Sequence, residues 1–107
     1  MTKTIRSQLV LAVVVSLAGA VGLAQSSGEA TYKAKCQSCH GATGLADTTA
    51  GKALKVKPVT DPEVKNFAEG RMIDATTNGM GKMQPFKGKL TDAQIKDAVA
   101  YFRTFIK

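Results

Sequence analysis

The sequence predicts a small all-α protein with three to four short helices. Two stretches repeat apolar residues at helical spacing, and the later one opens with a capping box, which marks the first turn of a helix. The one short run rich in valine, Val56-Lys57-Pro58-Val59, is interrupted by proline, so we expect no strand there. Helices must therefore supply the core.

The first predicted helix runs from about Glu29 to Cys39. Tyr32, Cys36 and Cys39 recur at positions i, i+4 and i+7 and therefore share one face. This arrangement places both thiols and the tyrosine ring against whatever the helix covers.

Loops and turns are predicted for the middle of the chain. Glycine and threonine dominate the passage after His40, which predicts a loop, with glycines at Gly41, Gly44 and Gly51. Asp61-Pro62 predicts a turn or the start of a short helix. A further helix is expected over residues 68–78, ending at Gly79.

The last predicted helix has the clearest signals. Thr91-Asp92-Ala93-Gln94 forms the capping box. Apolar residues follow at helical spacing at Ile95, Val99, Phe102 and Ile106, flanked by Ala98, Tyr101 and Phe105. In so small a domain, we expect this apolar face to lie on the core.

The segment Cys36-Gln37-Ser38-Cys39-His40 has the spacing of a c-type haem attachment site, in which two thiols bind the haem vinyl groups and the histidine binds the iron. A structural zinc site needs four ligands, and the chain offers three Cys and His residues in all. A thioredoxin-like motif needs a βαβ context, which the surrounding sequence lacks. A disulfide this short would restrict the unfolded chain only modestly. The pattern favours covalent haem c.

The N-terminus predicts export. Lys3 and Arg6 precede an apolar run from Leu9 to Ala24, and small residues end that run, as in a secretory signal peptide. We expect residues 1–24 to be cleaved and residues 25–107 to form a single domain in the periplasm. The run is shorter than the ~20 residues of a spanning helix, so a retained membrane anchor is the alternative.

Composition and charge set two further limits. The domain of residues 25–107 holds 19 Leu, Ile, Val, Met, Phe and Tyr residues, a thin core that a buried haem would reinforce. Lys3 and Arg6 leave with the signal, so 15 basic residues become 13, and 13 minus 8 acidic residues gives +5. Export and the lack of a basic run argue against nucleic acid.

Methionine is the natural candidate for the second axial position of the iron, because the chain has no second histidine. Met72 falls inside a predicted helix, where filling a gap in the core is its expected role. Met80 lies between two glycines in a flexible loop. Met83 is followed by Gln84-Pro85-Phe86, which can stiffen the loop. Residue chemistry slightly prefers Met83 and leaves Met80 open.

With these motifs in order, the chain resembles the small bacterial class I c-type cytochromes with one haem. The resemblance covers almost all of the predicted domain and rests on Gly28, Tyr32, the segment 36–41, the segment 83–91 and residues 98–101. It implies a cytochrome c fold in which the first and last helices cross closely, at the glycine and the aromatic residues.

The resemblance also implies roles for individual residues. Cys36 and Cys39 would form the haem thioethers, His40 would be the proximal iron ligand and Met83 the distal one. The chain departs from the family in two places. Gln84 stands between the ligand methionine and the proline that usually follows it directly. Thr49 replaces a proline whose carbonyl accepts the histidine Nδ1 proton in relatives; Thr49 or Pro58 would have to provide that carbonyl here.

The predicted function is single-electron transfer without catalysis, by a monomer that meets redox protein partners. Lysines lie just before the attachment motif and around Met83, at Lys33, Lys35, Lys82, Lys87 and Lys89, and they favour partners with acidic docking faces. The alternatives are a haem enzyme or gas-binding sensor with a vacant sixth position, and a cytochrome subunit of a larger respiratory complex.

Overall fold

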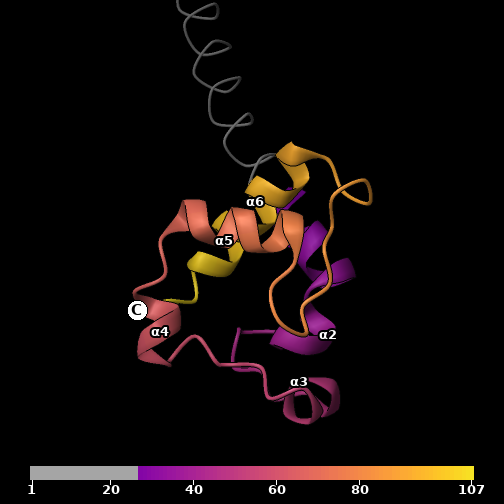
Figure 1. Ribbon diagram of the computed structural model, residues 1–107. Coiled ribbons are helices and arrows are strands. Elements are labelled where there is room, and N and C mark those ends of the chain that lie inside the picture. Colours follow the sequence, from indigo (N-terminus) through magenta and orange to yellow (C-terminus); the bar gives the residue numbers. More distant parts are fainter. Residues whose placement is uncertain (1–26) are drawn as a thin grey trace, which may run out of the picture.

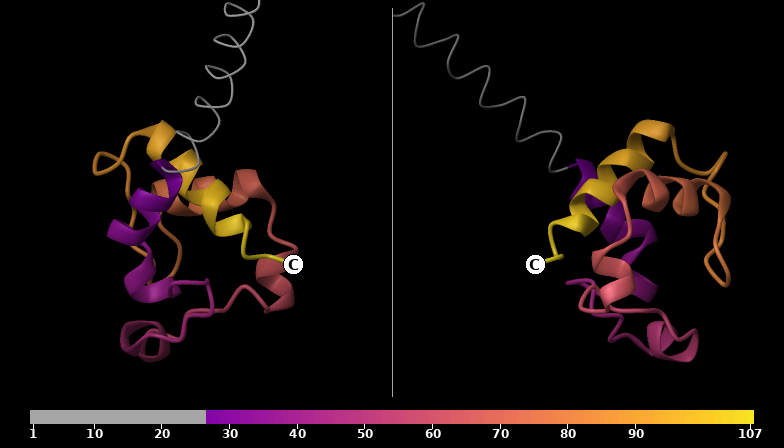
Figure 2. Two further views of the ribbon diagram at one scale, coloured as in Figure 1. Left: turned by 180° about the vertical axis from the view of Figure 1, so that it is seen from behind. Right: turned by 60° about the vertical axis from the view of Figure 1, so that its left-hand side comes forward.

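The computed structural model describes residues 27–107, which form a set of short helices joined by loops (Figures 1 and 2). A first helix covers residues 27–35, and the others are α2 (Gln37–His40), α3 (Thr49–Ala53), α4 (Pro62–Lys65), α5 (Glu69–Asn78) and α6 (Asp92–Arg103). Residues 27–107 form no strand, only two isolated bridges. The all-α prediction is confirmed, whereas the predicted signal peptide, residues 1–24, lies outside the described residues.

Helix α3 is the main difference from the predicted elements, because its residues were expected to lie in a loop. The Thr48 side chain caps it by accepting a hydrogen bond from the Gly51 N–H at 2.9 Å. Gly51 also lets α3 approach α2, since a Cβ at this position would lie 2.4 Å from the Cys39 carbonyl oxygen. This glycine therefore permits close packing of two helices, at a position where the sequence pattern predicted a loop.

The first helix crosses α6 at a point of close backbone contact. A Cβ on Gly28 would lie 2.4 Å from the carbonyl oxygen of Asp97, so only glycine fits. One turn further, the ring centroids of Tyr32 and Tyr101 are 5.3 Å apart. The crossing expected from the family resemblance is confirmed.

Helix α5 packs on α6 through the main apolar cluster of the described chain. Met72 of α5, Phe86 of the following loop and Ile95 and Val99 of α6 form this cluster, and each is at most 6% exposed. The capping box at Thr91 forms with both of its hydrogen bonds, so the amphipathic face of α6 begins where the sequence placed it. None of the helices within residues 27–107 has the length and apolar character needed to cross a membrane.

We expect Gly28→Val to lower the free energy of unfolding by about 1–3 kcal/mol, because the added side chain must push the two helices apart. Chemical denaturation of the haem-loaded protein measures this loss. Gly70→Ala is the matched control, because a Cβ at Gly70 meets nothing within 4 Å. That variant should gain stability, by up to about 1 kcal/mol. Equal stabilities of the two variants would contradict the close crossing.

Candidate haem-binding site

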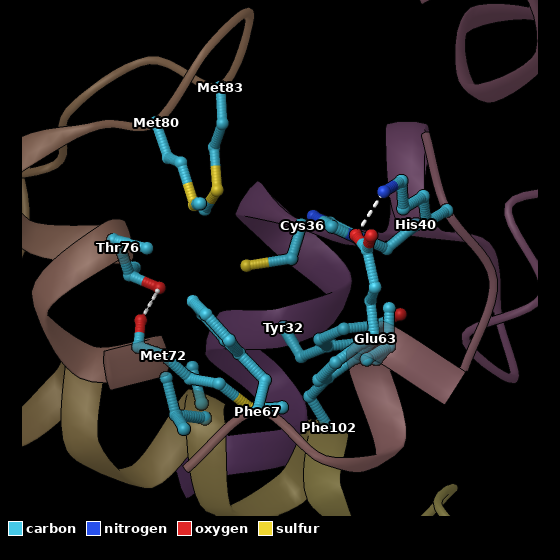
Figure 3. A pocket seen from close by; sticks show the side chains of 15 residues that line it. Tyr32, Cys36, His40, Glu63, Phe67, Met72, Thr76, Met80, Met83 and Phe102 are labelled. Atoms are coloured by element: carbon cyan, nitrogen blue, oxygen red, sulfur yellow. Dashed lines mark hydrogen bonds and ion pairs between the residues drawn. The ribbon is translucent and has the colours of Figure 1, made fainter. Parts of the chain in front are cut away.

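An apolar cavity of about 300 Å³ lies between the helices (Figure 3). Its walls come from the first helix, α2, α4, α5, α6 and the loop after α5. The lining residues are Tyr32, Cys36, His40, Lys57, Glu63, Val64, Phe67, Met72, Ala75, Thr76, Met80, Met83, Ala98, Val99 and Phe102. Lys57 and Glu63 are the charged members and form an ion pair with each other.

The attachment motif lies at the junction between the first helix and α2. Cys36 precedes α2, and its side chain projects into the cavity (Figure 3). Burial raises the pKa of the Cys36 thiol to about 11, and the neighbouring Cys39 adds to the rise. Cys39 is half-buried but does not line the cavity, and the two thiols form no disulfide. The structure therefore brings the side chains of Cys36 and His40 to the cavity, whereas Cys39 lies in α2 outside the cavity lining.

His40 ends α2 and presents its ring to the cavity. The ring packs edge-on against Phe102, with 5.4 Å between centroids. Burial lowers the pKa of His40, which favours the neutral imidazole that binds metals. Nδ1 is buried and finds no hydrogen-bond partner among the described residues. The expected acceptor, a carbonyl at Thr49 or Pro58, is therefore not in place in this structure.

The loop after α5 brings both candidate methionines to the cavity. The Met80 N–H donates to the Met83 carbonyl at 3.1 Å, and the Met83 N–H donates to the Met80 carbonyl at 2.9 Å. Both side chains point from this turn into the cavity (Figure 3). Met83 is half-buried and packs against the α5–α6 cluster, whereas Met80 is 55% exposed.

The methionine loop is fixed to the end of α5 by backbone hydrogen bonds. The N–H groups of Phe86 and Lys87 donate to the carbonyls of Thr76 and Thr77 at 2.9 and 3.0 Å. Phe86 is 6% exposed, as a residue packed beneath the site should be. Pro85 cannot donate, and the first pairing after it begins with Phe86. These hydrogen bonds therefore fix the position of the methionine loop relative to α5.

Met72 lies in the core, as its helical position predicted. It is 6% exposed within the α5–α6 cluster, and it also forms part of the cavity floor. Arg103, which sequence reasoning did not single out, donates from Nη1 to the Phe67 carbonyl at 3.1 Å and lies 3.8 Å from the Met72 sulfur. Phe67 is a further missed residue of the wall. Helical spacing could not reveal either contact, because Phe67 lies in a loop.

Tyr32 ties the first helix to the loop that follows the motif. Its hydroxyl donates to the Gly41 carbonyl at 2.6 Å, and the residue is 1% exposed. Burial raises the pKa of this phenol well above its usual value, so the hydroxyl stays protonated as a donor. The bond closes the chain around Cys36 and His40 and fixes the direction in which His40 leaves α2.

The cavity fits a covalently attached haem on two grounds. Its wall is largely apolar, as the porphyrin faces require. Its metal-binding donors are a neutral imidazole and thioethers, which are typical ligands of haem iron, and the Cys36 thiol lies in the same wall for a covalent bond to the haem.

Comparison with known proteins assigns the chain to a family. The model of the family described as cytochrome c oxidase, cbb3-type, subunit III matches residues 23–102. The chain belongs to this family and is a small class I c-type cytochrome. Its cofactor is haem c with iron, and it is a haem-based electron carrier whose partners are redox proteins.

Particular relatives are cytochromes c6. The chain is 34% identical over 76 residues to cytochrome c6 of Leptolyngbya boryana, covering 71% of this chain and 86% of the relative. It is 32% identical over 74 residues to cytochrome c6 of Synechocystis sp., covering 69% of this chain and 59% of the relative. The solved structure of the KustC0563 c-type cytochrome is similar with a TM-score of 0.67 and 33% identity, over 75% of this chain and 98% of that one.

We expect Tyr32→Phe to destabilise the protein by about 1–3 kcal/mol, because it leaves the buried Gly41 carbonyl without its donor. Denaturant titration of the haem-loaded protein measures the change. Among the side-chain hydrogen bonds of residues 27–107, Tyr101 takes part only through its backbone carbonyl, which accepts from the Thr104 hydroxyl. Tyr101→Phe therefore removes a hydroxyl that makes no such bond and should change stability by less than about 0.5 kcal/mol. Similar losses in the two variants would show that the Tyr32 hydrogen bond is unimportant.

Proposed function

We propose that the protein is a periplasmic single-electron carrier that acts as a free monomer. Residues 1–24 are the signal peptide, residues 25–107 are the cytochrome domain, and a retained signal would anchor the same domain to the membrane. The apolar N-terminal run supports export. The family match begins at residue 23, close to the proposed cleavage site, and supports the domain boundary.

Four residues of the proposed site bind the haem. Cys36 and Cys39 form thioethers with the vinyl groups, His40 is the proximal ligand and Met83 is the distal ligand. The observation that carries this proposal is the placement of the His40 ring and the methionine loop on opposite sides of the cavity (Figure 3). Met83 is preferred to Met80 because its side chain is already half-buried against the core.

These residues suit electron transfer because they close the site. Haem supplies a reversible change between ferric and ferrous iron when it is bound. His40 holds a neutral imidazole, and Met83 offers a neutral thioether that stabilises the ferrous state. With His40 and Met83 both bound to the iron, no coordination position would remain for a substrate. The wall is largely apolar. A ligand set that stays the same in both states needs little rearrangement between them.

The lysines of the methionine loop support partners with acidic docking faces. Lys82 and Lys87 are exposed on this loop, whereas Lys33 is paired with Glu29 at 2.9 Å. Unpaired positive charge beside the cavity steers acidic proteins toward it and adds little affinity. Electron transfer to such a partner should slow as ionic strength rises, and a rate independent of salt would contradict this docking mode.

The ligand set is tested on protein produced with haem-attachment machinery. We expect haem that stays bound after denaturation and an intact mass of residues 25–107 plus one haem. In the reduced protein, one methionine methyl signal should be shifted strongly by the haem ring. That signal should persist in Met80→Leu and be lost from its position in Met83→Leu. Colourless protein would refute the haem site, and the reverse pattern of signals would assign the distal position to Met80.

A permanent subunit of a larger complex is the second candidate, because the matching family is described as an oxidase subunit. The haem ligands would be the same, and the exposed lysines would face a fixed partner. Size-exclusion chromatography of the native exported protein separates the two functions. A monomer that exchanges electrons supports the carrier, and a stable stoichiometric complex supports the subunit.

A further inference from the structure

Met80, which has no role in the proposed ligand set, is paired through its backbone with the proposed distal ligand Met83. It exchanges both backbone hydrogen bonds with Met83, at 3.1 and 2.9 Å. Residues paired in this way across an antiparallel bridge project their side chains from the same face. Both thioethers consequently enter the cavity side by side (Figure 3).

The backbone around Met80 is the more adaptable half of this turn. Gly79 and Gly81 flank it with φ values of +84° and +57°, a region in which glycine is unstrained. A Cβ at Gly81 would meet nothing within 4 Å, so the outer side of the turn has room. Met80 is 55% exposed and is not committed to the core, in contrast to Met83.

Other donors in the cavity wall are already engaged. The Tyr32 hydroxyl donates to the Gly41 carbonyl, and the Thr76 hydroxyl donates to the Met72 carbonyl at 2.8 Å. Lys57 pairs with Glu63, and Met72 is packed in the core cluster. Among the described lining residues, Met80 is the potential iron ligand beside Met83. Its side chain can move without breaking a side-chain hydrogen bond, an ion pair or a contact in the core cluster.

We infer that Met80 is a reserve distal ligand: its thioether replaces that of Met83 on the iron whenever Met83 withdraws. This inference rests on the proposed function of Met83. The two sulfurs share one short turn, so Met80 competes as an intramolecular ligand against any ligand from solution. The exchange forms one iron–sulfur bond as another breaks, and it changes no charge. Its effect is to keep the site closed and the protein an electron carrier.

The test compares haem-loaded Met80→Leu, Met83→Leu and the double variant, since leucine nearly conserves the volume of methionine. Two readouts report ligation: the weak ferric absorption band of an iron–thioether bond, and the affinity of the reduced protein for carbon monoxide. We expect the band in both single variants and its loss in the double variant. Carbon monoxide should bind Met83→Leu at least about tenfold more weakly than the double variant, a difference of about 1.4 kcal/mol.

Leu54→Met is the matched control, because it exchanges the same two residue types at a position that is 39% exposed and does not line the cavity, and it should leave both readouts unchanged. Loss of the band in Met83→Leu, with carbon monoxide affinity equal to that of the double variant, would overturn the reserve role and leave Met83 as the ligand. Loss of the band in Met80→Leu alone would overturn both proposals. Covalent haem and the thermal midpoint of each variant confirm that the proteins compared are folded.

Discussion

The fold depends on an apolar cavity that its own side chains leave unfilled. Met72 and Val99, which belong to the α5–α6 cluster, and Phe102 of α6 also form part of the cavity wall. Only a few side chains pack fully against one another, chiefly between α5 and α6. A domain of this length gains little stability from so small a core, so a large apolar cofactor supplies the missing contact surface.

Two separate anchors hold the two sides of that cavity. The crossing at Gly28 and the hydrogen bond from Tyr32 to Gly41 fix the first helix, and with it Cys36 and His40. On the other side, the pairing of Phe86 with Thr76 fixes the methionine loop to α5. Helix α6 contacts both sides, since it packs on α5 and crosses the first helix. Helix α6 therefore links the part of the chain that carries His40 to the part that carries the methionine loop.

Local signals predicted the elements but not their mutual contacts. The capping box at Thr91 marks the start of α6, and Gly79 marks the end of α5. Both signals are local, so they can be recognised from the sequence alone. The spacing of the cysteines and His40 likewise identified the cofactor. Helix α3 was missed because its cap is a single threonine among several. The contact of Arg103 with Phe67 spans 36 residues, and no local periodicity encodes it.

The choice between the two methionines shows how far each kind of reasoning extends. Sequence chemistry favoured Met83 through the proline that follows it, and burial against the core gives the same preference by an independent route. Neither argument removes Met80, because the mutual hydrogen bonds make the two residues parts of one turn. Both thioethers project from this turn into the cavity, so one stays beside the site when the side chain of the other turns away. The distal iron ligand is therefore better understood as a property of the whole turn than of a single side chain. A turn that always presents a thioether prevents the iron of an electron carrier from acquiring a vacant coordination position.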